Sequence, residues 1–220
     1  MFTGIIEEVG RVVSVKRGRA SSVLTIAGTT IFDDIHLGDS IAVDGVCLTV
    51  STLNTASFSA DVMHETLERS TLGALTQNSN VNLERAMPAD GRFGGHIVSG
   101  HIDGRGTITS LRRDDNALWY TVRADQDILR YIVLKGSIAI DGISLTVAAL
   151  TEHDFSVSVI PHTAQATTLS QKRAGDLVNL ENDLIGKYVE RLLAFESSVG
   201  AGAAQKNSTL TREFLLKHGF

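Results

Sequence analysis

Residues 40–50 read SIAVDGVCLTV, and residues 137–147 read SIAIDGISLTV. Around this pair, residues 37–86 and 134–183 are identical at 20 of 50 positions without a gap, far more than unrelated sequences share. The period of 97 residues has the size of a domain and exceeds the units of solenoid proteins. The chain therefore contains a duplicated domain.

Each copy of this stretch has the pattern of a β-strand. Val46, Leu48 and Val50 fall on one face, and Cys47 and Thr49 fall on the other. An Asp-Gly pair, typical of a tight turn, precedes the strand in both copies. Further short strands are predicted over residues 9–15, 22–26, 58–62 and 81–84. About six short strands per half must close into a barrel or a sandwich to hide their edges.

Helix is predicted only near the end of the chain. Apolar residues recur at helical spacing from Leu184 to Leu193, and Asp183 can cap this segment. The next segment is rich in Gly, Ala and Ser, which is typical of a flexible chain. We therefore predict an all-β protein with an N-terminal domain over residues 1–97, a second domain over 98–196 with a helix at about 184–195, and a flexible tail over 197–220.

The composition argues against several classes of function. The net charge of −5 and the scattered basic residues argue against binding to nucleic acid. Cys47 is the only cysteine, which excludes an intrachain disulfide and a zinc ribbon. Without a basic leader or an apolar run of membrane-span length, the predicted location is the cytoplasm, with no membrane partner.

Three local features could belong to a catalytic or binding site, but none of them requires one. The glycine cluster at residues 91–95 lacks the Gly-Lys-Ser/Thr ending of a phosphate loop, which favours a linker. His96 and His101 are an odd number of positions apart, and no histidine pair has metal-ligand spacing, so no metal is predicted. Cys47 is either a nucleophile or a structural thiol, since no nearby residue is placed to activate it.

The repeat changes how these residues are interpreted. Thr49 and Thr146 recur at equivalent positions, as do Thr66 and Thr163, which suggests two equivalent small-molecule sites. The two halves differ at several positions inside matching surroundings: Cys47 against Ser144, Ile5 against His101, Glu65 against His162 and Gly38 against Lys135. A duplicated binder with such differences could hold one ligand twice and treat the two copies differently.

Five motifs together resemble the riboflavin synthase family. They are MFTGII at residues 1–6, DGVCLTV at 44–50, GHIVSGH at 95–101, DGISLTV at 141–147 and GKYVE at 186–190. The resemblance runs from Met1 to about Phe195. It implies two six-stranded Greek-key barrels and a C-terminal helix through which three subunits associate, with possible association with lumazine synthase.

The resemblance also implies the reaction. Two molecules of 6,7-dimethyl-8-ribityllumazine dismutate, one giving a four-carbon unit to the other, to yield riboflavin and 5-amino-6-ribitylaminouracil. Each barrel holds one pteridine, and the active site lies between the N-terminal barrel of one subunit and the C-terminal barrel of its neighbour. No cofactor is required, because the substrate is both donor and acceptor.

Matching the family's motifs assigns residues to this site. The substrate-binding residues would be Gly4, Ile5, Ile6, Cys47, Leu48, Thr49, Asp61, Val62, Met63, His64, Glu65, Thr66, Gly100, His101, Ile102, Lys135, Ser144, Leu145, Thr146, Ser158, Val159, Ile160, Pro161, His162 and Thr163. His101 titrates in a range suited to proton removal from the 7-methyl group. Ser40, Cys47 and Thr146 would polarise the ring or position an added nucleophile.

Two other functions fit the same pattern. A non-catalytic lumazine- or flavin-binding antenna protein of this fold is expected to degrade one site, whereas here both Cys-Leu-Thr and Ser-Leu-Thr are present. A flavin barrel of a larger reductase would need a nicotinamide-binding domain, which does not follow in this chain.

Overall fold

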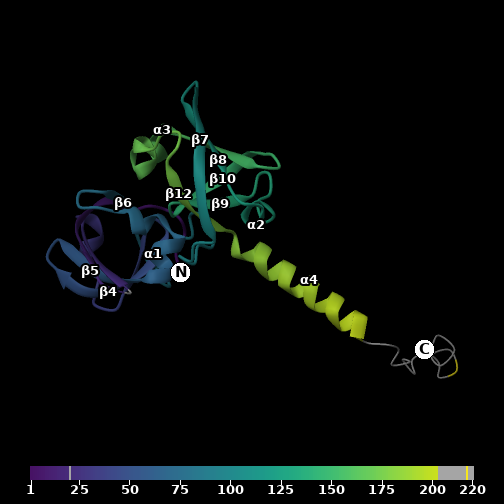
Figure 1. Ribbon diagram of the computed structural model, residues 1–220, viewed down its shortest axis with the longest axis horizontal. Helices are drawn as coiled ribbons and strands as arrows, with labels where there is room; N and C mark the ends of the chain where they lie inside the picture. Colours follow the sequence, from purple (N-terminus) through teal and green to yellow (C-terminus); the bar gives the residue numbers. More distant parts are fainter. Residues whose placement is uncertain (20, 203–216, 218–220) are drawn as a thin grey trace. The chain divides into compact units, whose positions relative to one another are not determined.

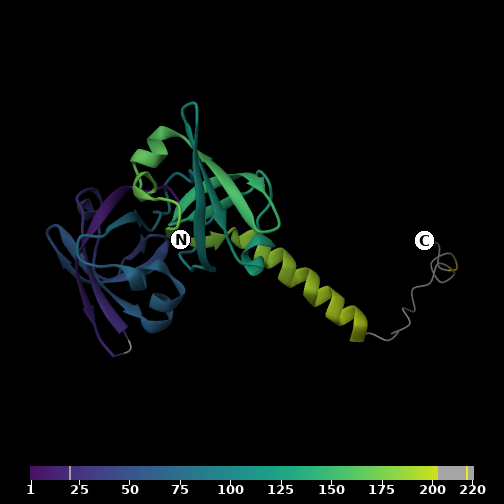
Figure 2. The ribbon, with the colours of Figure 1, turned by 45° about the horizontal axis from the view of Figure 1, so that its top comes forward.

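A computed structural model describes residues 1–19, 21–202 and 217, with side chains after Ala194 described only at residue 217. The chain divides into two compact units, Met1–Leu184 and Ile185–Phe220. The first unit contains two closed antiparallel barrels, shown in Figures 1 and 2 with the N-terminus between them. The prediction of two six-stranded barrels is confirmed.

The N-terminal barrel, or N-barrel, has the strand order β1-β2-β5-β4-β3-β6. Because β3, β4 and β5 are successive hairpins and β6 returns beside β3, this is the Greek-key arrangement. Its elements are β1 (Glu8–Arg17), β2 (Ser21–Ala27), η1 (Thr30–Asp33), β3 (Ser40–Val43), β4 (Val46–Asn54), β5 (Ser57–Met63), α1 (His64–Arg69), η2 (Thr71–Ala74) and β6 (Asn80–Arg85).

The C-terminal barrel, or C-barrel, repeats this circular order as β7-β8-β11-β10-β9-β12. Its elements are β7 (Gly104–Asp114), β8 (Ala117–Arg123), α2 (Gln126–Leu129), β9 (Ser137–Ile140), β10 (Ile143–Leu150), β11 (Asp154–Val159), α3 (Pro161–Gln165), η3 (Thr168–Gln171) and β12 (Leu177–Asn182). Each barrel encloses its own apolar core.

The sequence pattern that the two repeats share forms the β3–β4 hairpin and its counterpart, the β9–β10 hairpin. Asp44 and Gly45 have φ of 44° and 81°, and Asp141 and Gly142 have 45° and 81°. Two successive residues of positive φ form the tight turn whose twist matches that of the strands. In β4 the side chains of Val46, Leu48 and Val50 are then buried in the barrel, as the alternation predicts.

Both turns meet at a buried polar junction between the barrels. The Asn82 side-chain amide donates to the Asp141 carbonyl oxygen at 2.9 Å, and the Asn179 amide donates to the Asp44 carbonyl oxygen at 2.9 Å. The side-chain carboxyl groups of Asp44 and Asp141 accept bonds from the backbone N–H groups of Asn82 and Asn179, respectively. Lys172 lies 2.8 Å from the Asp141 carboxylate. The repeat thus builds a nearly two-fold junction with one added cation.

The second unit begins with α4 (Leu184–Gly202), which continues beyond the predicted end near residue 195. Its predicted apolar stripe is present, with Ile185, Tyr188, Val189, Leu192 and Leu193 each at least half exposed. None of the described helices is long and apolar enough to cross a membrane. Most of the predicted flexible tail, residues 203–216 and 218–220, lies outside the described residues.

Candidate functional site

Two short segments cross between the barrels, and we call them the crossing segments: residues 3–6 and 99–102. The Ser144 N–H, on the C-barrel strand β10, donates to the Gly4 carbonyl oxygen at 2.8 Å. The Cys47 N–H, on the N-barrel strand β4, donates to the Gly100 carbonyl oxygen at 2.9 Å. Each barrel is therefore completed by a segment that precedes the strands of the other one.

Two glutamates hold the crossing segments in place. The Glu84 carboxylate accepts from the Thr3 N–H, the Thr3 hydroxyl and the Gly4 N–H at 2.7, 2.8 and 3.0 Å. Glu181 does the same for the Ser99 N–H, the Ser99 hydroxyl and the Gly100 N–H at 2.6, 2.7 and 3.0 Å. Burial raises the pKa of the Glu84 carboxyl, although these bonds favour its charged form.

Glycine is required where each segment touches its strand. Gly4 and Gly100 have φ of 78° and 85°, a region that other residues rarely occupy. A Cβ on Gly100 would lie 2.5 Å from the Cβ of Cys47, and a Cβ on Gly4 would lie 2.6 Å from that of Ser144. The close approach brings the following residues, His101 in one segment and Ile5 in the other, to the outer face of a barrel.

On the N-barrel the predicted residues come together around two pockets of about 370 and 390 Å³. Cys47, Met63 and Thr66 line both pockets. The first is completed by Leu48, Thr49, Ser51, Asp61 and Val62, and the second by Val46, His64, Glu65, Arg69, Ser70, Gly100, His101 and Ile102. The exposed His101 thus belongs with Cys47, and its Nδ1 lies 3.2 Å from the Ser99 hydroxyl oxygen.

On the C-barrel the corresponding residues occupy equivalent elements. Ser144 and Thr146 lie on β10, Ser158 lies on β11, and the segment from Ile160 to Thr163 leads into and forms α3. Thr146 and Ser158 are exposed on the outer face of the barrel, as Thr49 and Asp61 are on the N-barrel. Ile6 packs against the C-barrel core just as Ile102 packs against the N-barrel core.

Four of the predicted binding residues point away from any ligand on this outer face. The side chains of Leu48 and Val62 are buried in the N-barrel core, and those of Leu145 and Val159 are buried in the C-barrel core. Only their backbone groups can reach a bound molecule. Their outward neighbours, such as Thr49 and Thr146, expose side chains on this face.

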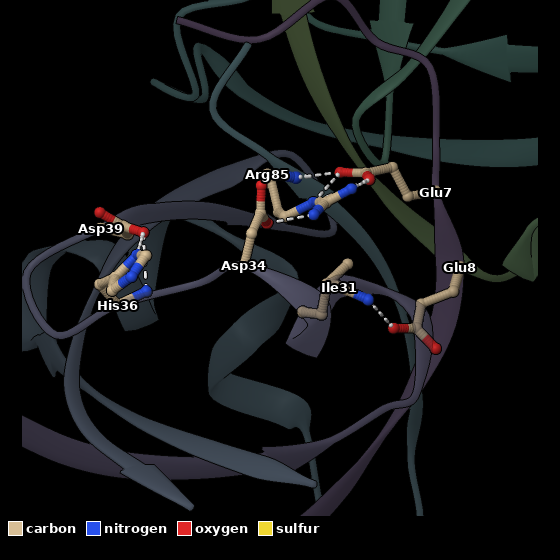
Figure 3. A network of polar contacts seen from close by, with 7 residues as sticks. All are labelled: Glu7, Glu8, Ile31, Asp34, His36, Asp39 and Arg85. Carbon is tan, nitrogen blue, oxygen red and sulfur yellow. Dashed lines mark hydrogen bonds and ion pairs between the residues drawn. The ribbon is translucent and has the colours of Figure 1, made fainter. Parts of the chain in front are cut away.

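Ser40 lies at the edge of the predicted site. It pairs with Thr49 across β3 and β4 but lines a separate pocket of about 440 Å³ with Thr3 and Ile5. The floor of this pocket includes Arg85, whose guanidinium pairs with Glu7 and Asp34, as Figure 3 shows. These two carboxylates raise the pKa of Arg85, and the cation is satisfied without a ligand.

Lys135 has a positive φ, a backbone conformation that a glycine, Gly38, adopts at the equivalent position of the other repeat. Its φ is 67°, and that of Gly38 is 90°. The two residues make equivalent bonds, with the Lys135 N–H donating to Val147 and the Gly38 N–H to Val50, each at 2.9 Å. A lysine in this costly conformation fits a functional side chain, and Lys135 is exposed just before β9 begins.

Sequence reasoning missed the contact between His96 and Ser144. The His96 Nδ1 lies 2.7 Å from the Ser144 hydroxyl oxygen, and the direction of this bond depends on the imidazole tautomer. Burial lowers the pKa of the His96 imidazole. The described residues contain no group of three or more possible metal ligands. No local pattern joins two residues 48 positions apart, so only the folded chain reveals the pair.

The repeated strand order and the two crossing segments define a protein built from two barrels of one kind. A family model described as the lumazine binding domain matches residues 3–86 and again residues 99–183. Riboflavin synthase of Actinobacillus pleuropneumoniae is 51% identical to this chain, and that of Bacillus subtilis is 48% identical, each over all of both chains. Riboflavin synthase of Mycobacterium tuberculosis is 49% identical over 88% of this chain and 98% of its own. The chain belongs to the riboflavin synthase family.

Solved structures show the same fold. Two crystal structures of LumP, one complexed with 6,7-dimethyl-8-(1'-D-ribityl) lumazine and one with riboflavin, match with TM-scores of 0.75 and 0.77. Each alignment covers 83% of this chain and 99% of the other, at 21% and 22% identity. At this identity the likeness establishes the architecture and leaves the activity to other evidence.

Proposed function

We infer that this protein is a riboflavin synthase, which converts two molecules of 6,7-dimethyl-8-ribityllumazine into riboflavin and 5-amino-6-ribitylaminouracil. One observation carries the conclusion: the lumazine binding domain matches both repeats, within a chain 44–51% identical to three riboflavin synthases along its whole length. The four-carbon transfer needs two bound pteridines, and the repeat supplies two equivalent places for them.

The site residues suit a flat, uncharged ligand. Backbone groups of β4 and β10, together with the hydroxyls of Thr49, Thr66, Thr146 and Thr163, can bond a uracil-like edge without a basic patch. His101, exposed beside Cys47, would exchange a proton with the 7-methyl group of the ligand. Holding two rings face to face contributes to the rate through proximity.

We propose further that the active site is shared between subunits of a cytoplasmic homotrimer. Thr49, Asp61 and Met63 are exposed on the outer face of the N-barrel, so a ring bound there keeps one side uncovered. A second ring on the C-barrel of a neighbouring subunit would cover it. The exposed apolar side chains of α4 supply the surface for association. An association with lumazine synthase, which the resemblance also implies, is tested by co-sedimentation of the two purified proteins.

The decisive experiment is to incubate the purified protein with the lumazine alone and follow riboflavin absorbance. The expected result is one riboflavin formed for each two lumazines consumed, with no added cofactor. A protein that is purified with a fluorescent ligand and does not convert the lumazine would instead be a non-catalytic antenna protein of the same fold. That outcome would overturn the proposed activity while leaving the fold and the two sites in place.

A further inference from the structure

The C-barrel carries a buried histidine behind one of its site residues. His96 is only 7% exposed, and its Nδ1 lies 2.7 Å from the hydroxyl oxygen of Ser144. Ser144 is the repeat counterpart of Cys47, which lines the N-barrel pockets. Among the side chains of residues 1–19 and 21–194, none is hydrogen-bonded to the Cys47 thiol. The two sites therefore also differ in what stands behind this position.

The backbone around His96 fixes the ring against Ser144. The His96 N–H donates to the Thr3 carbonyl oxygen at 3.1 Å, and Phe2 and Val98 form a reciprocal bridge between the two segments. The adjacent Gly95 packs so closely that a Cβ on it would lie 1.9 Å from the Thr3 oxygen and 3.0 Å from the Ser144 Cβ. The imidazole is thus held by the same strand pairing that brings the first crossing segment to the C-barrel.

The surroundings of the ring indicate which nitrogen carries the proton. Burial favours the neutral imidazole, which has a single N–H. Nε2 of His96 is buried and has no hydrogen-bond partner among the described residues. A buried N–H without a partner is rarer than an unsatisfied acceptor. The proton therefore belongs on Nδ1, where it is donated to the Ser144 oxygen.

We propose that His96 is a positioning residue that makes the Ser144 hydroxyl a hydrogen-bond donor toward the ligand of the C-barrel. With its oxygen occupied by the Nδ1–H, the half-buried Ser144 turns its own O–H away from His96, toward a carbonyl oxygen or ring nitrogen of the pteridine. The Cys47 thiol is a much weaker donor. The C-barrel thus offers an oriented donor that the N-barrel lacks. This inference rests on the proposed function, because it assumes one pteridine in each barrel.

Two substitutions of similar polarity separate this role from a merely structural one. His96→Asn places an amide N–H near the position of the Nδ1–H, whereas His96→Gln places it near Nε2. We expect riboflavin titration of the full chain, followed by flavin fluorescence, to give two sites in the parent and in His96→Asn with affinities within about twofold. His96→Gln should weaken one of the two sites about three- to tenfold, the effect of one lost hydrogen bond, and leave the other unchanged.

A double-substitution comparison assigns the loss to Ser144. Ser144→Ala should weaken the same site to a similar extent, and adding His96→Gln to it should have almost no further effect. If circular dichroism shows that His96→Gln is unfolded, Ser144→Cys replaces it: a weak donor at this position should weaken the site as alanine does.

Several results would overturn the inference. These are equal losses in His96→Asn and His96→Gln, no loss in either, losses at both sites, or additive effects of His96→Gln and Ser144→Ala. If Ser144→Cys replaces His96→Gln, full riboflavin affinity in the Ser144→Cys variant would also overturn the inference. A parent protein that binds fewer than two riboflavins per chain would contradict the proposed function itself, and is visible before any variant is compared.

Discussion

The two buried aspartates of the barrel junction should respond to the same substitution in opposite directions. Asp44 and Asp141 are 5% and 0% exposed, and the Lys172 ammonium lies 2.8 Å from the Asp141 carboxylate. Burial raises the pKa of both carboxyls, and the charge of Asp141 raises that of Asp44 further. Because one cation balances one carboxylate, we assign the charge to Asp141 and a retained proton to Asp44.

The magnitudes follow from what each substitution removes. Asp44→Asn keeps the oxygen that accepts from the Asn82 N–H at 2.8 Å and removes a group that is costly to ionise, so it should raise the free energy of unfolding at pH 7 by on the order of 1 kcal/mol. Asp141→Asn leaves the largely buried Lys172 without its partner, which should cost about 3 kcal/mol.

The same assignment fixes the sign of a pH dependence. The folded protein keeps the Asp44 proton at pH values where the unfolded chain, with a pKa of about 3.9, has released it. The stabilising contribution is therefore complete below that pKa and is lost as the pH rises through the higher folded value. Thermal unfolding of the parent and both variants from pH 4 to 8, at one protein concentration, measures this. A melting temperature that shifts in the same direction for both variants, or an unchanged slope in Asp44→Asn, would refute the assignment.

Three further predictions concern the sites and the association of subunits. Gly100→Ala should lower the melting temperature and reduce turnover at least about tenfold, because the added Cβ would meet the Cβ of Cys47. Gly38→Ala is the control in both assays, because Gly38 has a similar φ but open space around it. Cys47→Ser and His101→Gln should each lower the steady-state rate at least about tenfold, a barrier change of roughly 1.4 kcal/mol, and both variants should still bind riboflavin. If both variants keep the rate of the parent, catalysis depends on positioning of the substrates alone. Truncation after Asp183 should yield smaller particles by light scattering with reduced activity, and a fully active monomer would exclude a shared site.

Much of the fold could be predicted from the sequence because local sequence patterns determine its strands and turns. The alternation in β4, the Asp-Gly turns and the repeat itself predict strands, hairpins and a duplicated domain that closes as a barrel or a sandwich, and the family resemblance selects the barrels that the structure shows. The outward positions Thr49 and Thr146 followed from the same alternation, and so did the buried neighbours Leu48 and Leu145, although motif matching had grouped all four as binding residues.

What could not be predicted is which barrel each crossing segment joins. Gly4 precedes the N-barrel strands yet contacts Ser144, and Gly100 precedes those of the C-barrel yet contacts Cys47. Local sequence specifies the turn of a segment but not its distant partner. The change of repeat spacing from 97 to 96 gives no signal of this exchange, because Gly10 of β1 and Gly106 of β7 share the spacing of 96 with the crossing segments.

The crossing segments also explain how a nearly symmetric frame can hold two unequal sites. Because Glu84 and Glu181 bind the two segments in the same way, Ile5 and His101 occupy equivalent positions in the two segments. His101 lines an N-barrel pocket with Cys47, whereas Ile5 lines the separate pocket of Ser40. Ile102 packs on the N-barrel core, so a chain ending at residue 97 would lack part of both that core and its pocket. Each barrel is completed by a segment of the other repeat, and the two contacts use unlike residues, Gly4 with Ser144 and Gly100 with Cys47.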